Sequence, residues 1–226
     1  LINVDDPRPF GLVPTDAEGR VTAFLEKPQT PEEIVTHQIN AGCYVFSRRV
    51  IDAIPSGRPV SVERETFPEL LAAQAPVVGW IEDAYWLDLG NPLAFAKGSR
   101  DLVMGVAPSP AVPGPTGAAL VLGSAHVHTS ARVDGGTCIG DGAAVQADAI
   151  VTGSVVMDGA TIESGACIVN SIIGRGAVVG AGTVCTDTVI ADRARIGANN
   201  EFVSGTRVFP DAVIGNTAIR SSSDRS

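Results

Sequence analysis

The sequence is poor in aromatic residues, in histidine and in positive charge. Aromatic residues make up 5% of its 226 residues, there are 3 histidines, and 16 lysines and arginines stand against 25 aspartates and glutamates. The net charge of −9 argues against a protein that binds nucleic acid or an anionic membrane, because both need a broad basic surface. A local basic pocket for a phosphate group remains compatible with this charge.

Long hydrophobic runs and paired cysteine motifs are also missing. No apolar stretch approaches the roughly 20 residues that a membrane-spanning helix needs, so we expect no association with a membrane. The four cysteines, Cys43, Cys138, Cys167 and Cys185, form no CxxC or Cys/His metal motif. We therefore expect reduced thiols in a cytoplasmic protein.

The chain begins at Leu1, and its first residues resemble the interior of a strand. We therefore expect it to be the C-terminal part of a longer protein. Residues 105–119 read GVAPSPAVPGPTGAA, which predicts an extended linker because proline blocks helix formation. The predicted domains are thus residues 1–104, this linker, a repetitive domain at 120–218 and a polar tail at 219–226.

In the first domain, predicted strands alternate with predicted helices, which indicates a mixed α/β fold. Short apolar runs predict strands at 21–25 and 39–46. Helical spacing of apolar residues predicts helices at 48–54, 62–74 and 92–104.

Beyond the linker, aliphatic residues recur with a step of six. The ladder consists of Val127, Val133, Ile139, Val145, Ile150, Val156, Ile162, Ile168, Ile173, Val179, Val184, Ile190, Ile196, Phe202, Val208 and Ile214. Three steps, which end at Ile150, Ile173 and Val184, are five residues long. A helical period of about 3.6 cannot keep such residues on one face. The pattern predicts a parallel β-helix and resembles the left-handed hexapeptide-repeat family, with about five coils.

The repeat alone is compatible with an acyltransferase or with a structural and oligomerising module. An acyltransferase needs a general base, usually histidine. The candidates nearby are His126 and His128, in the short segment AHVHT, for which we favour a solvent-exposed or capping role. The repeat is therefore interpreted as an assembly and support module, and we expect a homo-oligomer, because an open β edge tends to associate.

Three motifs in the first domain are weak when each is taken alone. Glu26-Lys27-Pro28 ends an apolar strand and is compatible with a solvated terminus. Residues 39–46, INAGCYVF, are compatible with a turn before a strand. Residues 85–92, YWLDLGNP, are compatible with a core segment in which Asn91 caps a helix and Asp88 is a loop acid.

Taken together, these motifs resemble the sugar-phosphate nucleotidyltransferases, and within them the mannose-1-phosphate guanylyltransferases. The resemblance rests on FGLVPTD (10–16), FLEKPQTP (24–31), INAGCYVF (39–46), SVERETFPELL (61–71) and YWLDLGNPLAF (85–95), followed by hexapeptide repeats. It implies a partial Rossmann-like domain before a left-handed β-helix. It also implies the conversion of mannose 1-phosphate and GTP into GDP-mannose and pyrophosphate.

The resemblance implies a role for five residues on the sugar side. Gly11 would let the backbone approach the sugar ring, and Glu26 would accept hydrogen bonds from sugar hydroxyls. Lys27 would place its cation on the sugar phosphate and act as a catalytic residue. Asn40 and Gly42 would line the sugar pocket.

The resemblance also implies a magnesium site. Asp88 would bind Mg²⁺ as the second catalytic residue, which suits an ion that takes one or two carboxylates and phosphate oxygens. Trp86 would form a pocket wall or part of the core.

The family's GGxGTRL nucleotide-binding loop does not occur in this sequence. The GxG triplets at 140–142, 174–176 and 180–182 fall within the predicted solenoid. Three hypotheses stay open: a guanylyltransferase for mannose, a nucleotidyltransferase that joins glucose 1-phosphate to dTTP or UTP, and a non-catalytic scaffold or regulatory relative.

Overall fold

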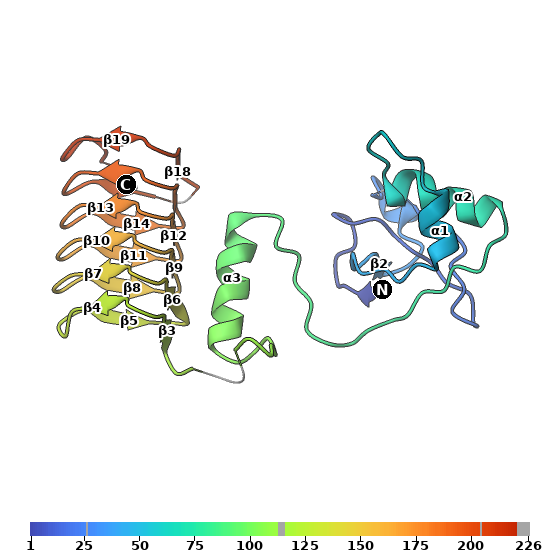
Figure 1. Cartoon of the computed structure of the whole chain (residues 1–226), viewed down its shortest axis with the longest axis horizontal. Coiled ribbons are helices and arrows are strands. Elements are labelled where there is room, and N and C mark those ends of the chain that lie inside the picture. The colour runs from blue at the N-terminus through green and yellow to red at the C-terminus, as the bar shows by residue number, and fades with distance from the viewer. Residues whose placement is uncertain (26, 113–115, 204, 221–226) are drawn as a thin grey trace. The chain divides into compact units, whose positions relative to one another are not determined.

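A computed structural model describes residues 1–25, 27–112, 116–203 and 205–220 of the chain. The chain divides into two compact units, Leu1–Trp86 and Leu87–Ser226, and each unit is described by itself (Figure 1). α3, at Pro92–Val103, is the longest helix, and no helix among the described residues has the length and apolar character that a membrane crossing requires.

The first unit is a small mixed α/β assembly with little regular sheet. Its strands are β1 (Ile2–Asn3) and β2 (Gln38–Ile39), which pair antiparallel. Its helical elements are η1 (Pro31–Glu33), α1 (Arg48–Ala53), η2 (Val62–Thr66) and α2 (Phe67–Ala72). The helices predicted at 48–54 and 62–74 are confirmed, although the second begins as a π-helical turn capped by the Ser61 hydroxyl, which accepts from the Arg64 N–H.

The strands predicted at 21–25 and 39–46 are much shorter than expected. Val21 and Leu25 make only isolated antiparallel bridges, and in the second run only Ile39 belongs to a strand. The apolar side chains of the second run instead pack as an aromatic cluster. Tyr44 and Phe46 lie against Phe67 of α2, which in turn stacks on Phe24 with ring centroids 4.4 Å apart.

The second unit is a parallel β-solenoid preceded by α3. Seventeen short strands among the described residues form three parallel sheets of six, five and six strands. The strands are β3 (Ala119–Val121), β4 (His126–Val127), β5 (Arg132–Asp134), β6 (Thr137–Ile139), β7 (Ala144–Val145), β8 (Ile150–Thr152), β9 (Val155–Val156), β10 (Thr161–Ile162), β11 (Cys167–Val169), β12 (Ile172–Ile173), β13 (Val178–Val179), β14 (Val184–Thr186), β15 (Val189–Ile190), β16 (Arg195–Ile196), β17 (Glu201–Phe202), β18 (Arg207–Val208) and β19 (Val213–Ile214).

Each sheet is one wall of the solenoid, and successive coils stack in register (Figure 1). The predicted parallel β-helix is confirmed. Its first strand, β3, lies one step of six residues before the predicted ladder, with Val121 preceding Val127. The walls enclose one continuous aliphatic core, in which side chains such as Ile139, Ile162 and Ile173 are fully buried.

Two positions of the predicted ladder were wrong. Val151 and Cys185 are fully buried in the core, whereas Ile150 and Val184 point outward from β8 and β14. The step from Val145 to Val151 is therefore six residues, and the short step follows it, from Val151 to Val156. The sequence misled because Ile150 and Val184 are as apolar as their neighbours, so hydrophobicity alone could not identify which of two adjacent residues faces inward.

The short step always falls at the same corner, between the sheet of β8 and the sheet of β9. Buried hydroxyls occupy this corner at Thr137, Ser154, Ser171 and Thr188. The Ser154 and Ser171 hydroxyls each accept from the backbone N–H of the hydroxyl residue 17 positions later, at 3.0 Å, and each also donates to a carbonyl two residues before it. Asn170 and Asp187 turn the chain there with positive φ. These hydrogen bonds satisfy polar groups that a shortened corner would otherwise bury unpaired.

Helix α3 is part of the solenoid unit. It packs against β6, and Ala96 and Val103 are buried. At the turn before β6, a Cβ added to Gly136 would meet the Met104 Cγ at 3.0 Å, so glycine permits this close approach. The compact units therefore divide at Trp86, whereas the predicted domain boundary at residue 104 follows the change in sequence pattern.

The corrected ladder makes a stability prediction. Val151→Thr should lower the free energy of unfolding by about 1–3 kcal/mol, because it buries a hydroxyl in an aliphatic core. Ile150→Thr, the matched control on the outer face, should cost less than about 1 kcal/mol. Urea unfolding followed by circular dichroism measures both, and a larger loss in Ile150→Thr would contradict the assigned register.

Candidate functional site

The first unit brings three of the predicted motifs side by side. Leu12, which is 1% exposed, bridges to Leu25 on one side and to Ile39 on the other. The Leu12 N–H donates to the Leu25 carbonyl at 3.0 Å, and the Asn40 N–H donates to the Gly11 carbonyl at 3.3 Å. The buried Leu12 of FGLVPTD thus lies beside Ile39, the first residue of INAGCYVF, and beside Leu25, the residue before Glu26.

Gly11 and Gly42 differ in what their backbone requires. A Cβ on Gly11 would lie 3.5 Å from the Leu25 carbonyl oxygen, an ordinary contact, so the protein itself does not demand glycine there. Gly42 has φ +78°, a conformation that favours glycine, and its N–H donates to the Asn40 Oδ1 at 3.0 Å. The Asn-Ala-Gly segment is therefore a turn stabilised by the Asn40 side chain, which agrees with the interpretation of INAGCYVF as a turn.

The Asn40 side chain joins a polar cluster that the sequence did not reveal. Its Nδ2 donates to the Tyr44 hydroxyl and to the Glu63 Oε1, both at 2.5 Å, and Tyr44 donates to Glu63 at 3.1 Å. Burial is the main cause that raises the pKa of Tyr44, and the nearby Glu63 carboxylate adds to it. Glu63 lies in the quoted motif SVERETFPELL, but only the turn of η2 shows that it faces Asn40.

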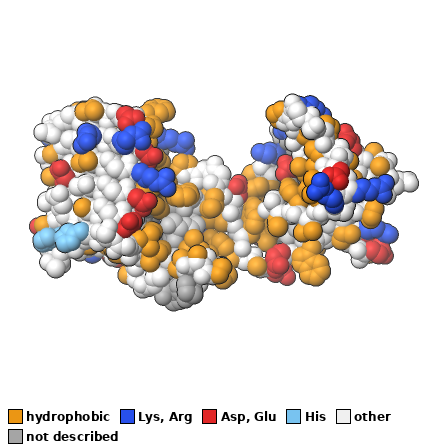
Figure 2. Space-filling model, in the orientation of Figure 1, with side chains coloured by type: hydrophobic (Ala, Val, Ile, Leu, Met, Phe, Trp, Pro, Cys, Tyr) orange, Lys and Arg blue, Asp and Glu red, His pale blue; other side chains and the backbone are white. Residues whose placement is uncertain are grey.

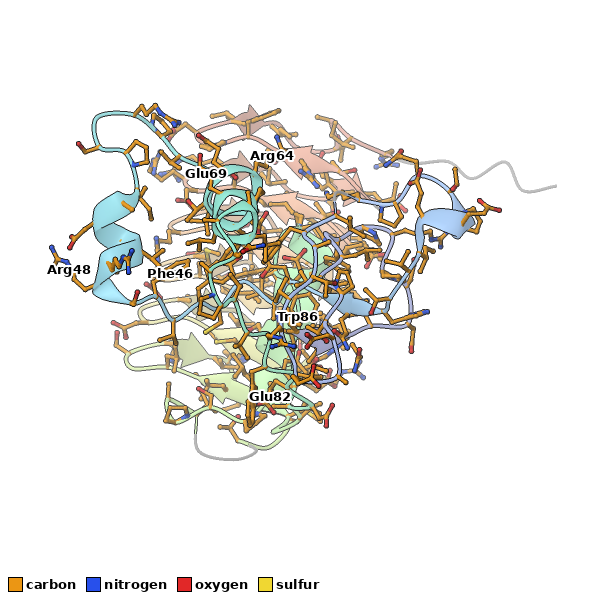
Figure 3. All side chains as sticks on the ribbon, turned by 90° about the vertical axis from the view of Figure 1, so that its right-hand side faces the viewer. Phe46, Arg48, Arg64, Glu69, Glu82 and Trp86 are labelled. Atoms are coloured by element: carbon orange, nitrogen blue, oxygen red, sulfur yellow. The ribbon has the colours of Figure 1, made fainter. Side chains whose placement is uncertain are left out.

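Trp86 connects the INAG turn to the start of the chain. Its Nε1 donates to the Ala41 carbonyl at 3.3 Å, and its ring meets Phe10 edge-on with centroids 5.6 Å apart. It also lines a cavity of about 270 Å³ with Asn3 and Glu82. Trp86 and Phe46, which belongs to the separate aromatic cluster, are labelled in Figure 3. Trp86 is therefore both core and cavity wall.

The Glu-Lys pair is only partly described. Glu26 lies outside the described residues. Lys27 is exposed, and its carbonyl accepts from the Gln29 side chain at 3.0 Å. Among the described residues, none of the ion pairs involves Lys27.

Asp88 belongs to the second compact unit. It is exposed, and its carboxylate accepts from the Gly90 N–H at 3.0 Å. The helix start predicted after it is confirmed, since the Asn91 Oδ1 accepts from the Ala94 N–H at 2.9 Å and Pro92 begins α3. Within the described ranges no three His, Cys, Asp or Glu residues gather into a metal site. As a single exposed carboxylate, Asp88 fits one ligand of a Mg²⁺ that also takes phosphate oxygens.

The solenoid histidines make local contacts. His126 is exposed on β4, and the His128 Nδ1 accepts from the Ser130 N–H at 3.2 Å and lies 2.9 Å from the Ser130 hydroxyl. Histidine side chains are visible on the surface at the first coils (Figure 2). His128 therefore caps a turn, which supports the capping role over that of a general base.

The GxG triplets of the solenoid are turns. A Cβ on Gly140 would lie 2.6 Å from the Asp158 backbone nitrogen, and Gly142 has φ +65°. Glycine is needed here for the stacking of one coil on the next, which accounts for these triplets without a nucleotide.

Two family models match the chain. Residues 1–104 match the nucleotidyl transferase model, and residues 116–223 match the model of the GMPPB C-terminal domain. The mannose-1-phosphate guanylyltransferase of Mycobacterium tuberculosis is 55% identical over 146 residues, which are 64% of this chain and 40% of that protein. Mannose-1-phosphate guanylyltransferase 1 of Arabidopsis thaliana is 34% identical over 155 residues, 67% of this chain and 40% of that protein. The chain thus spans about two fifths of the length of these relatives.

Among solved structures, PerB from Caulobacter crescentus in complex with CoA and GDP-perosamine covers 46% of this chain and 48% of its own. The sequence identity is 24% and the TM-score is 0.34.

The Asn40–Glu63 contact makes a pH-dependent prediction. Asn40→Asp would place two carboxylates in contact, which raises the folded-state pKa of one of them. A raised carboxyl pKa stabilises the fold below the unfolded pKa of about 4, and this stabilisation is lost as the pH rises through the folded pKa. Asn40→Asp should therefore be less stable than Asn40→Ala at pH 7, by about 1–3 kcal/mol, and the gap should close toward pH 4. Thermal unfolding across this pH range measures it, and a gap that does not change with pH would contradict the contact.

Proposed function

We propose that this chain, of which residues 1–104 match the nucleotidyl transferase model and residues 116–223 the GMPPB C-terminal domain model, forms the sugar-phosphate side of an enzyme that transfers a nucleotidyl group to a sugar 1-phosphate. The observation that carries this proposal is the pairing of Leu12 with both Leu25 and Ile39. This pairing brings Gly11, Asn40 and the residues just before the Glu-Lys pair close together. These are segments that the family resemblance assigns to a sugar pocket.

We propose mannose 1-phosphate and GTP as the substrates. The 55% identity to the mannose-1-phosphate guanylyltransferase of Mycobacterium tuberculosis supports this choice over glucose 1-phosphate with dTTP or UTP. The activity assay below includes both pairs, so it also tests the substrate.

The proposed reaction is an in-line displacement at phosphorus. One oxygen of the sugar 1-phosphate attacks the α-phosphorus of GTP, the bond from that phosphorus to the bridging oxygen of the β-phosphate breaks, and pyrophosphate leaves. No covalent intermediate with the protein is needed, so positioning and charge neutralisation supply the catalysis.

Each proposed residue has one task in this reaction. Lys27 binds the sugar phosphate as a point charge on a flexible stem. Asn40 and Gly42 line the sugar pocket, and Gly11 lets the backbone approach the sugar ring. Asp88 holds Mg²⁺, and when bound the ion neutralises charge on the phosphates. Glu63 orients Asn40 through the hydrogen bond between their side chains.

The nucleotide side belongs, in our proposal, to residues outside these 226. The motif GGxGTRL does not occur in the sequence, and the relatives are much longer than this chain. The solenoid then serves as an assembly and support module of a cytoplasmic homo-oligomer, and the net charge of −9 does not favour nucleic acid as a partner.

Two substitutions in the full-length enzyme test the proposed roles. Lys27→Ala should raise the KM for mannose 1-phosphate by roughly 30-fold or more, and change that for GTP much less, because losing one charge-assisted contact costs about 2 kcal/mol or more. Asp88→Asn should lower Mg²⁺-dependent kcat by a similar factor. Arg48→Ala, which removes an exposed cation of α1, is the control and should leave both constants unchanged. Unchanged Mg²⁺-dependent turnover in Asp88→Asn would reject its metal role.

The division of the site between this chain and other residues makes a second prediction. The 226 residues alone should not release pyrophosphate from GTP and mannose 1-phosphate, whereas the full-length protein should. A coupled pyrophosphate assay measures both, with glucose 1-phosphate and dTTP or UTP as the comparison. GTP-dependent turnover by the 226 residues would contradict this division.

A further inference from the structure

The segment that carries Asp88 has no regular secondary structure of its own. Leu87, Asp88 and Leu89 lie in neither helix nor strand, in the loop that leads into α3 (Figure 1). Among the described residues, none of the backbone–backbone hydrogen bonds involves any of these three residues. A loop without backbone partners takes its conformation from its side-chain contacts and its two ends. The position of Asp88 therefore depends on the side chains beside it.

Two of these side chains fold back onto α3 at a single glycine. Gly98 is buried in the middle of α3. A Cβ built there would lie 2.8 Å from the Leu89 Cδ2 and 3.4 Å from the Leu87 Cδ2. Apart from its chain neighbours and its own helix backbone, no other described atom would lie within 4 Å of that Cβ. A notch in α3 at Gly98 therefore receives the two leucines that flank Asp88.

Helix propensity does not explain this glycine. Glycine is the least favourable residue in a helix interior after proline. The backbone of Gly98 is helical and its φ is not positive, so its conformation does not require glycine. The space left by its missing side chain is filled by Leu87 and Leu89. The packing of these two leucines is therefore what glycine permits at this position.

The same packing turns Asp88 away from α3. Because Leu87 and Leu89 both reach Gly98, the side chain between them points to the other side, as successive side chains do in an extended chain. Asp88 is exposed accordingly. Gly90 adds a second constraint, since its N–H donates to the Asp88 Oδ1 at 3.0 Å and a Cβ on Gly90 would lie 3.2 Å from both carboxylate oxygens. The carboxylate is thus fixed from two sides.

The solenoid provides a firm base for this contact. α3 packs against β6, and a Cβ added to Gly136, in the turn before β6, would lie 3.1 Å from the Arg100 carbonyl oxygen of α3. The helix is therefore seated closely on the first coils. A side chain added at Gly98 then displaces the loop of residues 87–89, which has no backbone partners, rather than the helix.

We propose that Gly98 is a positioning residue for Asp88. Its missing side chain admits Leu87 and Leu89, and the two leucines hold the carboxylate in place for Mg²⁺. Groups that orient a metal ligand govern metal affinity nearly as strongly as the ligand itself. This inference rests on the proposed function, because it needs Asp88 to bind the metal. It also gives the solenoid a further task, since the solenoid holds α3 and α3 holds the loop of Asp88.

Filling the notch in the full-length enzyme tests this role. The probe is Mn²⁺, whose free concentration is followed by electron paramagnetic resonance in the presence of mannose 1-phosphate. Gly98→Leu displaces both leucines and should raise the Mn²⁺ dissociation constant about tenfold or more, as loss of an outer contact to a metal ligand does. At saturating Mg²⁺ the KM for mannose 1-phosphate should change less than about threefold, because the proposed sugar contacts are untouched.

Two further variants separate positioning from general damage to the helix. Ser99→Leu adds the same side chain at the next, half-exposed position of α3 and should leave the Mn²⁺ constant within about twofold. Gly98→Ala is milder, because only the end of the Leu89 side chain has to move. Alanine favours the helix, so the melting temperature should not fall, while the Mn²⁺ constant should rise about threefold. A lower melting temperature with unchanged Mn²⁺ binding would mark a merely structural glycine and overturn the proposal.

A compensating pair gives the sharpest test. Adding Leu89→Ala to Gly98→Leu removes the volume that the first substitution adds, so the Mn²⁺ dissociation constant should return within about threefold of the original. No recovery in this double variant, or unchanged Mn²⁺ binding in Gly98→Leu, would overturn the proposal. Asp88→Asn is the reference. If it too leaves Mn²⁺ binding unchanged, the metal role of Asp88 is rejected and this proposal with it, whereas weaker binding in Asp88→Asn alone rejects only the positioning by Gly98.

Discussion

The fold of the second unit depends on one repeated hydrogen bond at its shortened corner. There a buried hydroxyl accepts a hydrogen bond from the backbone N–H 17 residues later. The Ser154 hydroxyl accepts from the Ser171 N–H, and the Ser171 hydroxyl accepts from the Thr188 N–H. This bond keeps successive coils in register while the chain saves one residue at the corner. Because the coils stay in register, the inward side chains stack into one column, and the outward side chains form straight rows. The continuous aliphatic core of the solenoid follows from that register.

Much of this architecture could be predicted from the sequence. A step of six over more than 80 residues identifies a solenoid, and Asn91-Pro92 identifies the start of α3. The choice between Ile150 and Val151, or between Val184 and Cys185, could not be made, because adjacent apolar residues carry no information about which one faces inward. The hydroxyl at the corner was the missing signal: Ser154 lies three residues after Val151, and Ser171 and Thr188 repeat that distance from Ile168 and Cys185.

The sugar-side cluster was less accessible to sequence reasoning. The family resemblance around Asn40 suggested residues for a sugar pocket, but not their partners, because Glu63 reaches Asn40 across 23 residues through the π-helical turn of η2. Asn40 already uses its amide N–H groups on Tyr44 and Glu63. In the proposed sugar pocket, a sugar hydroxyl would use the second lone pair of Asn40 Oδ1, since the first accepts from the Gly42 N–H, or would exchange with one of these bonds.

The central claim is that these 226 residues carry the sugar-phosphate side of a nucleotidyl-transfer site and not the nucleotide side. Amide chemical shifts of the isotope-labelled chain, titrated separately with mannose 1-phosphate and with GTP, test it most directly. We expect mannose 1-phosphate to shift the amides of Gly11, Lys27 and Gly42, and GTP to leave them in place. Shifts of these amides with GTP alone, or sugar-phosphate shifts confined to the solenoid, would contradict the account.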